Sequence, residues 1–87
     1  MIEPGTYPSY LTEIVIPDNI RSIEAEAFRG FDKTEKIIVP DSVKDIGYRA
    51  FEYCTAKVIF TKTSPMIPKL EDGCGKFGLE KENIFFV

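Results

Sequence analysis

A stretch of this sequence repeats itself after 23 residues, and no other feature constrains the possible folds as strongly. Apolar residues and a Pro-Asp pair of the first copy recur in the second copy at one constant offset. The matched pairs are Ile14 and Ile37, Ile16 and Val39, Pro17 and Pro40, Asp18 and Asp41, Ile20 and Val43, Ile23 and Ile46, Ala27 and Ala50, Phe28 and Phe51, and Phe31 and Cys54. A unit of this length is too small to bury its own apolar face, so a fixed period predicts units that stack on one another.

Two further copies follow, and both are less regular. Residues 57–60 read like 36–39 at an offset of 21, and 83–87 resemble 13–17, beginning 26 residues after the start of the third copy. We therefore divide the chain into an N-terminal capping segment and a repeat region. The capping segment is 1–10, the repeat region is 11–87, and its repeats are 11–33, 34–56, 57–82 and a partial repeat, 83–87.

Each repeat predicts the same series of local structures. Ile14, Val15 and Ile16 begin a period-2 alternation that is typical of a short strand with one buried face, and Pro17 ends it because proline has no N–H for the ladder. The Ala-Phe pair that comes later in each copy suits a helical turn. We expect Gly47 to supply a backbone conformation that other residues resist, although Glu24 occupies the matching position in the first copy.

The second copy is similar to a known repeat pattern. It reads Ile37-x-Val39-Pro40-Asp41-Ser42-Val43-x-x-Ile46-Gly47-x-x-Ala50-Phe51. This pattern resembles the BspA-like (Treponema pallidum type) class of leucine-rich repeats, with Thr34 standing where that family prefers leucine. The resemblance implies an α/β-type repeat solenoid of about three and a half repeats. Short parallel strands would line its concave face, and helical or 3-10 turns would line its convex face.

The resemblance also implies a function. Members of this family are typically surface or secreted proteins of bacteria and some protists, with roles in adhesion, coaggregation and other protein contacts, and they offer no catalytic residues to carry over. We therefore expect a protein–protein interaction module of adhesion or scaffold type, at the cell surface or secreted if the chain belongs to a longer protein. The alternative is a small free-standing acidic inhibitor of mobile-element type, cytoplasmic if the chain is complete, that blocks a larger basic partner; the net charge of −3 favours it.

A candidate partner-binding stripe follows from the strand periodicity. Residues between the core positions of a strand face solvent, so four apolar side chains would form one column on the concave face. They are Val15, Ile38, Ile59 and Phe85, and Lys36 and Lys57 run beside them. Polar residues are the norm on an exposed sheet face, which makes an apolar column informative. Two alternatives stay open: β-branched residues favour strands in any case, or a terminal segment covers the stripe.

Other functional classes find little support. The chain has no histidine, which removes the commonest general base and most zinc ligands, so we expect no enzyme, cofactor or metal site. Lys and Arg form no cluster, which disfavours direct nucleic-acid binding, and no segment has the roughly 20 apolar residues that membrane insertion needs. A weak cation site at Asp18 and Asp41 is outweighed by a role in turns.

The remaining unusual residues give four smaller predictions. We expect Cys54 to be a buried thiol and Cys74, between two glycines, to be exposed. We expect Tyr7 and Tyr10 to cover the N-terminal end of the core. For Tyr48 and Tyr53 we favour packing over exposed contacts. Residues 85–87 predict an apolar edge strand, which a longer chain, a second copy in a homo-oligomer, or the partner could cover.

Overall fold

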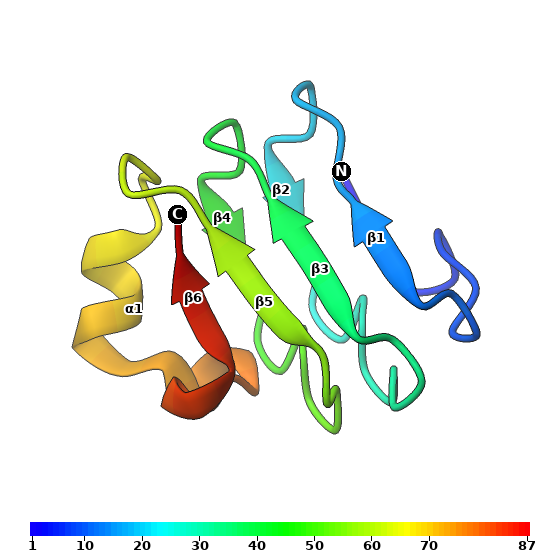
Figure 1. Cartoon of the computed structure of the whole chain (residues 1–87). Helices are drawn as coiled ribbons and strands as arrows, with labels where there is room; N and C mark the ends of the chain where they lie inside the picture. Colours follow the sequence, from blue (N-terminus) through cyan, green and yellow to red (C-terminus); the bar gives the residue numbers. More distant parts are fainter.

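The structure, a computed structural model that describes residues 1–87, consists of short parallel strands from successive repeats (Figure 1). Four strands form one parallel sheet in the order β1-β3-β5-β6. They are β1 (Glu13–Val15), β3 (Lys36–Val39), β5 (Lys57–Phe60) and β6 (Ile84–Phe86). Two shorter strands, β2 (Ser22–Ile23) and β4 (Asp45–Ile46), form a second parallel sheet behind the first in the view of Figure 1.

The strand register confirms the repeat offsets read from the sequence. Ile14 pairs with Ile37, so the first two copies lie side by side at an offset of 23. The less regular copies also pair as expected, because Ile37 faces Val58 and Val58 faces Ile84. A shift by one residue would turn Lys36 and Lys57 toward the core in place of Ile37 and Val58, and this fixes the register despite the unequal spacing.

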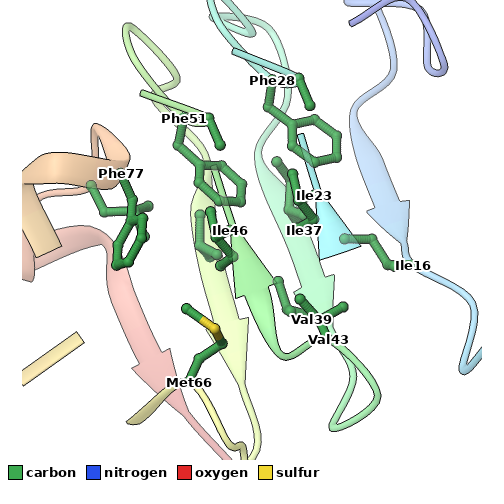
Figure 2. Packing of buried hydrophobic residues seen from close by; sticks show 14 of the residues in the cluster. Ile16, Ile23, Phe28, Ile37, Val39, Val43, Ile46, Phe51, Met66 and Phe77 are labelled. Carbon is green, nitrogen blue, oxygen red and sulfur yellow. The ribbon is translucent and has the colours of Figure 1, made fainter. Parts of the chain in front are cut away.

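The core lies between the two sheets and is built from ladders of equivalent side chains. Phe28 and Phe51 stack at 5.2 Å between ring centroids, and Phe77 continues this row in the third repeat (Figure 2). Phe28 and Phe51 are fully buried, and so is Ile37 of the strand ladder. Burying one such side chain contributes roughly 1.5–3 kcal/mol before conformational entropy is counted.

The side of the core opposite the four-stranded sheet is made mostly of turns. The Ala-Phe segments of the first two repeats adopt turns rather than regular helix. Only the third repeat carries helices: α1 (Ile67–Gly73) and the 3-10 helices η1 (Cys74–Phe77) and η2 (Lys81–Asn83). Backbone hydrogen bonds still link these segments across repeats, since the Phe28 N–H donates to the Ala50 carbonyl at 2.7 Å and the Phe51 N–H to the Phe77 carbonyl at 2.8 Å. None of the helices has the length and apolar composition to cross a membrane.

The first ten residues pack against the first full repeat. Ile2 is buried and forms a parallel bridge with Ile23. Tyr7 stacks on Phe28 at 6.0 Å between centroids, which confirms the expectation that it covers this end of the core. The same expectation is wrong for Tyr10, whose side chain is 71% exposed. Ile2 and Tyr7 lie 21 residues before Ile23 and Phe28. They therefore occupy, in the N-terminal segment, the positions that Ile23 and Phe28 occupy in the first repeat.

Thr34, the residue that departs from the family pattern, has a structural role. It is buried, and its hydroxyl donates a hydrogen bond of 2.6 Å to the carbonyl oxygen of Leu11 in the preceding repeat. A leucine would fill space here but could not satisfy that carbonyl. Thr34 therefore provides a hydrogen bond between repeats where a leucine would provide apolar packing.

The two cysteines reverse the sequence expectation. Both are free thiols. Cys74 is buried in the core, because η1 turns it inward beside Leu70 and Phe77, so the prediction of an exposed Cys74 is wrong. Cys54 is only half-buried, and burial raises the pKa of its thiol. A raised pKa keeps the thiol protonated and slow to react.

Gly47 is required for a reason that differs from the expected one. Its φ is not positive, so the expectation of an unusual backbone conformation is wrong. A Cβ at this position would lie 2.3 Å from the backbone nitrogen of Ala25. The Gly47 N–H donates to the Ile23 carbonyl at 2.7 Å, and this bond draws the two repeats together.

Asp41 connects the turns after two neighbouring strands. Its carboxylate accepts hydrogen bonds from the hydroxyls of Thr61 and Thr63. These bonds, with Thr61 contributing most, lower the pKa of Asp41 below its ordinary value of 3.8. They favour the charged carboxylate in the folded state. Their stabilisation is present above the pKa of the unfolded chain and fades as the pH falls through the lower folded pKa.

We expect Gly47→Ala to lower the free energy of unfolding by about 1–3 kcal/mol, because the added methyl group meets backbone that cannot move freely. Urea unfolding followed by circular dichroism measures the change. The matched control is Gly75→Ala, since a Cβ there meets nothing within 4 Å. It should shift stability by less than about 0.5 kcal/mol. Equal midpoints for the two variants would contradict this account of Gly47.

We expect an NMR titration of the carboxyl carbons to place the pKa of Asp41 below 3.8. Thr61→Val should raise that pKa toward its ordinary value, because it removes the main hydrogen bond to the charged form. Thr63→Val should raise it less. A pKa of Asp41 that is the same in all three proteins would show that the hydroxyls do not stabilise its charge.

Candidate functional site

The four apolar residues predicted to face solvent form one column across the larger sheet. Val15 pairs with Ile38, Ile38 with Ile59, and Ile59 with Phe85. We call these four residues the outward stripe. With strands about 4.8 Å apart, the stripe is roughly 14 Å long.

Exposure along the outward stripe is greatest at its two ends. Val15 is 64% exposed and Phe85 is 40% exposed, whereas Ile38 and Ile59 are half-buried between their neighbours. These values show that neither end of residues 1–87 covers the stripe. The general preference of β-branched and aromatic residues for strands still accounts for the identity of all four residues, so the stripe is distinguished by its alignment and exposure.

The charged residues beside the stripe also lie where the sequence placed them. Glu13, Lys36 and Lys57 are in register on neighbouring strands, two residues before the stripe and therefore on the same face. The Lys36 ammonium lies 3.7 Å from the Glu13 carboxylate. The Lys57 ammonium lies 5.8 Å from the centre of the Phe85 ring, a cation–π contact that orders both side chains.

A polar hollow of about 310 Å³ adjoins this end of the sheet. Its lining is Thr12, Glu13, Glu35, Lys36 and Lys57. The hollow contains equal numbers of acidic and basic residues, and none of its lining is apolar. The stripe is therefore bordered on one side by charges of both signs, as expected of an apolar contact surface with a polar rim.

The end of the sheet differs from the expectation at Phe86. The alternation that places Ile84 on the core side also turns Phe86 inward, and Phe86 does lie beside Phe60, with ring centroids 6.2 Å apart. It is nevertheless 43% exposed, because no strand of the structure lies beyond β6 to cover it. Phe86 instead lines a hollow of about 400 Å³ between β6 and α1, together with Leu70, Glu71, Cys74, Lys81 and Ile84. No repeat pattern in the sequence places a helix at Ile67–Gly73 beside β6, and this hollow was therefore not predicted.

Two tyrosines that were expected to pack are at the surface instead. Tyr48 is 61% exposed and Tyr53 is 69% exposed, so the packing prediction is wrong for both. Each ring is contacted by an arginine from the turns outside the smaller sheet, Arg49 for Tyr48 and Arg29 for Tyr53. The alternation rule that worked for the strands has no counterpart in these irregular turns.

Comparison with known proteins gives one match. Residues 6–74 match the family described as "BspA type Leucine rich repeat region (6 copies)", which is most of the chain. Searches of the curated proteins and of the solved structures found no match. Repeats of this family suggest a protein-interaction module and are generally non-catalytic. The repeated strand-and-turn units, their parallel register and the family match together show that this chain belongs to the BspA-type leucine-rich-repeat family.

Proposed function

We propose that the chain is a protein-binding module that uses the outward stripe as the centre of its contact surface, with Lys36 and Lys57 at the edge. The observation that carries this proposal is the in-register column of exposed or half-exposed apolar residues, Val15, Ile38, Ile59 and Phe85. Exposed apolar columns are uncommon on solvent-facing sheets and often mark binding sites.

The module is proposed to be a segment of a curved solenoid. In this arrangement the four-stranded sheet lies on the concave side, the turns and α1 lie on the convex side, and residues 11–87 provide about three and a half repeats after the segment 1–10. A concave sheet would surround a partner on more than one side. The parallel stacking of all four strands supports this geometry.

The proposed role is adhesion or scaffolding without catalysis. The family match supports it, since repeats of this family are generally non-catalytic. The sequence also has no histidine, the side chain that most often acts as a general base.

The alternative, an acidic inhibitor that blocks a basic partner, rests on the net charge of −3. The charges beside the stripe do not favour it. Lys36 and Lys57 lie there with two acidic residues, Glu13 and Glu35, so this surface has no excess of negative charge for a basic partner. A partner with an apolar patch and acidic residues near Lys57 is more complementary to this surface.

Replacing both central stripe residues tests the proposal. Partners are first identified with the natural chain, and their affinities are then measured by biolayer interferometry for the double variant Ile38→Lys, Ile59→Lys. We expect binding to weaken by about 30-fold for each residue replaced, since residues at the centre of an interface often contribute about 2 kcal/mol each. The circular dichroism spectrum should not change.

Tyr53→Lys is the matched control, because it places the same charge on an exposed aromatic residue in a turn outside the smaller sheet. It should leave the affinity unchanged. The proposal would be wrong if the double variant, still folded, bound its partners as tightly as the natural chain does.

A further inference from the structure

Two of the turns outside the smaller sheet hold non-glycine residues in a left-handed backbone conformation. The residues are Glu26, Arg49 and Tyr53, with φ values of 61°, 56° and 59°. Such a conformation is unfavourable for residues with a Cβ and easy for glycine. At the position equivalent to Glu26 and Arg49, the N-terminal segment has Gly5, whose φ is 89°. The repeat thus accepts glycine at this place, but the second repeat has Arg49.

The Arg49 side chain is held in place without an acidic partner. Its guanidinium carbon lies 4.9 Å from the centre of the exposed Tyr48 ring. The ion pairs of the chain involve Arg29, Lys36, Lys69 and Lys76, and no carboxylate lies within 4.0 Å of Arg49. The Tyr48 side chain, and more weakly the Glu52 carboxylate beyond ion-pair distance, raise the pKa of Arg49. An arginine stacked on a ring in this way is ordered and can still bind a carboxylate.

Tyr48 also lines a hollow of about 310 Å³ that faces neither the outward stripe nor the polar hollow beside it. The lining residues are Ile46, Tyr48, Lys69, Lys76 and Phe77. Ile46 and Phe77 are buried core residues of neighbouring repeats (Figure 2), so they give the hollow an apolar floor. Lys69 and Lys76 give it basic walls.

The charge of this hollow differs from that of the other three. Each of the others has at least one glutamate in its lining, whereas this one has none. Lys69 pairs with Asp45 at 3.0 Å and Lys76 lies 4.0 Å from Asp72. Both aspartates are strongly exposed, and exposed pairs of this kind are weak and easily exchanged for a ligand carboxylate.

We propose that Arg49 and the hollow lined by Tyr48, Lys69 and Lys76 form a second binding site, which takes an acidic segment of a protein partner. An apolar side chain of that segment lies on Ile46 and Phe77, and a neighbouring carboxylate is bound by Arg49 and the lysines. Arginine clusters that border an apolar surface recognise acidic motifs in this way. The site does not depend on the outward stripe, because it is formed by β4, the turn after it, α1 and η1.

The left-handed backbone at Arg49, which Glu26 and Tyr53 share, allows the assignment to be tested. Glycine adopts this conformation more easily than arginine does, so Arg49→Gly should stabilise the fold while it weakens binding. A residue with only a structural role would lose stability when it is removed.

The first test uses NMR spectra of the isotopically labelled full chain, titrated with a five-residue peptide of alternating aspartate and leucine. We expect saturable shifts of the backbone amides of Tyr48, Arg49, Lys76 and Phe77. The same peptide with asparagine for aspartate should cause none. Absence of shifts with the acidic peptide, or shifts spread over the other lysines and arginines, would overturn the proposal.

The second test compares Arg49→Gly with Tyr53→Gly, which relieves the same kind of backbone conformation outside the hollow. Both variants should raise Tm by about 4 °C. Only Arg49→Gly should weaken peptide binding, by at least tenfold, and Arg49→Gln should weaken it as much while the turn keeps its Cβ. Unchanged affinity in both Arg49 variants, or an equal loss in Tyr53→Gly, would show that Arg49 does not bind the ligand.

Discussion

The structure depends on the alignment of equivalent apolar side chains in neighbouring repeats. Ile14, Ile37, Val58 and Ile84 lie in one line across the larger sheet, and Phe28 and Phe51 stack on the opposite side of the core. No single repeat could exclude water from these residues, so each unit is stable only against its neighbours. Features that bring repeats into close contact therefore matter as much as the apolar residues. One of them is the hydrogen bond from the Thr34 hydroxyl to the Leu11 carbonyl oxygen. Another is the close approach of the Gly47 backbone to Ala25, which leaves no room for a Cβ.

The same alignment explains how the chain tolerates repeats of unequal length. The offset between paired strands falls from 23 to 21 and then rises to 26, yet the inward and outward faces stay in step. The connections between the strands differ in length, which the fold tolerates because surface loops can gain or lose residues without changing the strand pairing. The extra residues of the third repeat form α1, and Phe77 returns to the place that Phe51 occupies in the repeat before.

The two proposed binding surfaces differ in character, as their positions in the fold require. The outward stripe is made of strand residues, whose directions are fixed by the sheet, and it is apolar with charges at its edge. The hollow beside Tyr48 is made by irregular turns and α1, and it combines an apolar floor with basic side chains. A regular strand face gives a flat surface suited to broad contact, whereas turns can enclose a smaller group on several sides. A protein with both surfaces could bind two partners, or two parts of one partner.

The sequence predicts the exposure of side chains well for residues in strands and poorly for residues outside them. The offsets of the copies gave every strand pairing of the larger sheet, and the period-2 alternation gave the whole outward stripe with Lys36 and Lys57, because side-chain direction in a strand follows from position alone. Residues outside the strands were less predictable. Tyr10, Tyr48 and Cys74 were each assigned the wrong exposure, since the inward-outward alternation of strands does not extend to the segments that carry them.

What the sequence by itself determined is the repeat, the family, the strand register and the residues that face outward. Only the tertiary structure decided that Cys74 is buried and that Phe86 is partly exposed, and that the hollow beside Tyr48 exists. The physical reason is that burial in a loop or at the end of a sheet depends on which other segment lies over the residue. That placement is set by contacts between residues far apart in the chain, such as Lys69 with Asp45, which no local pattern encodes.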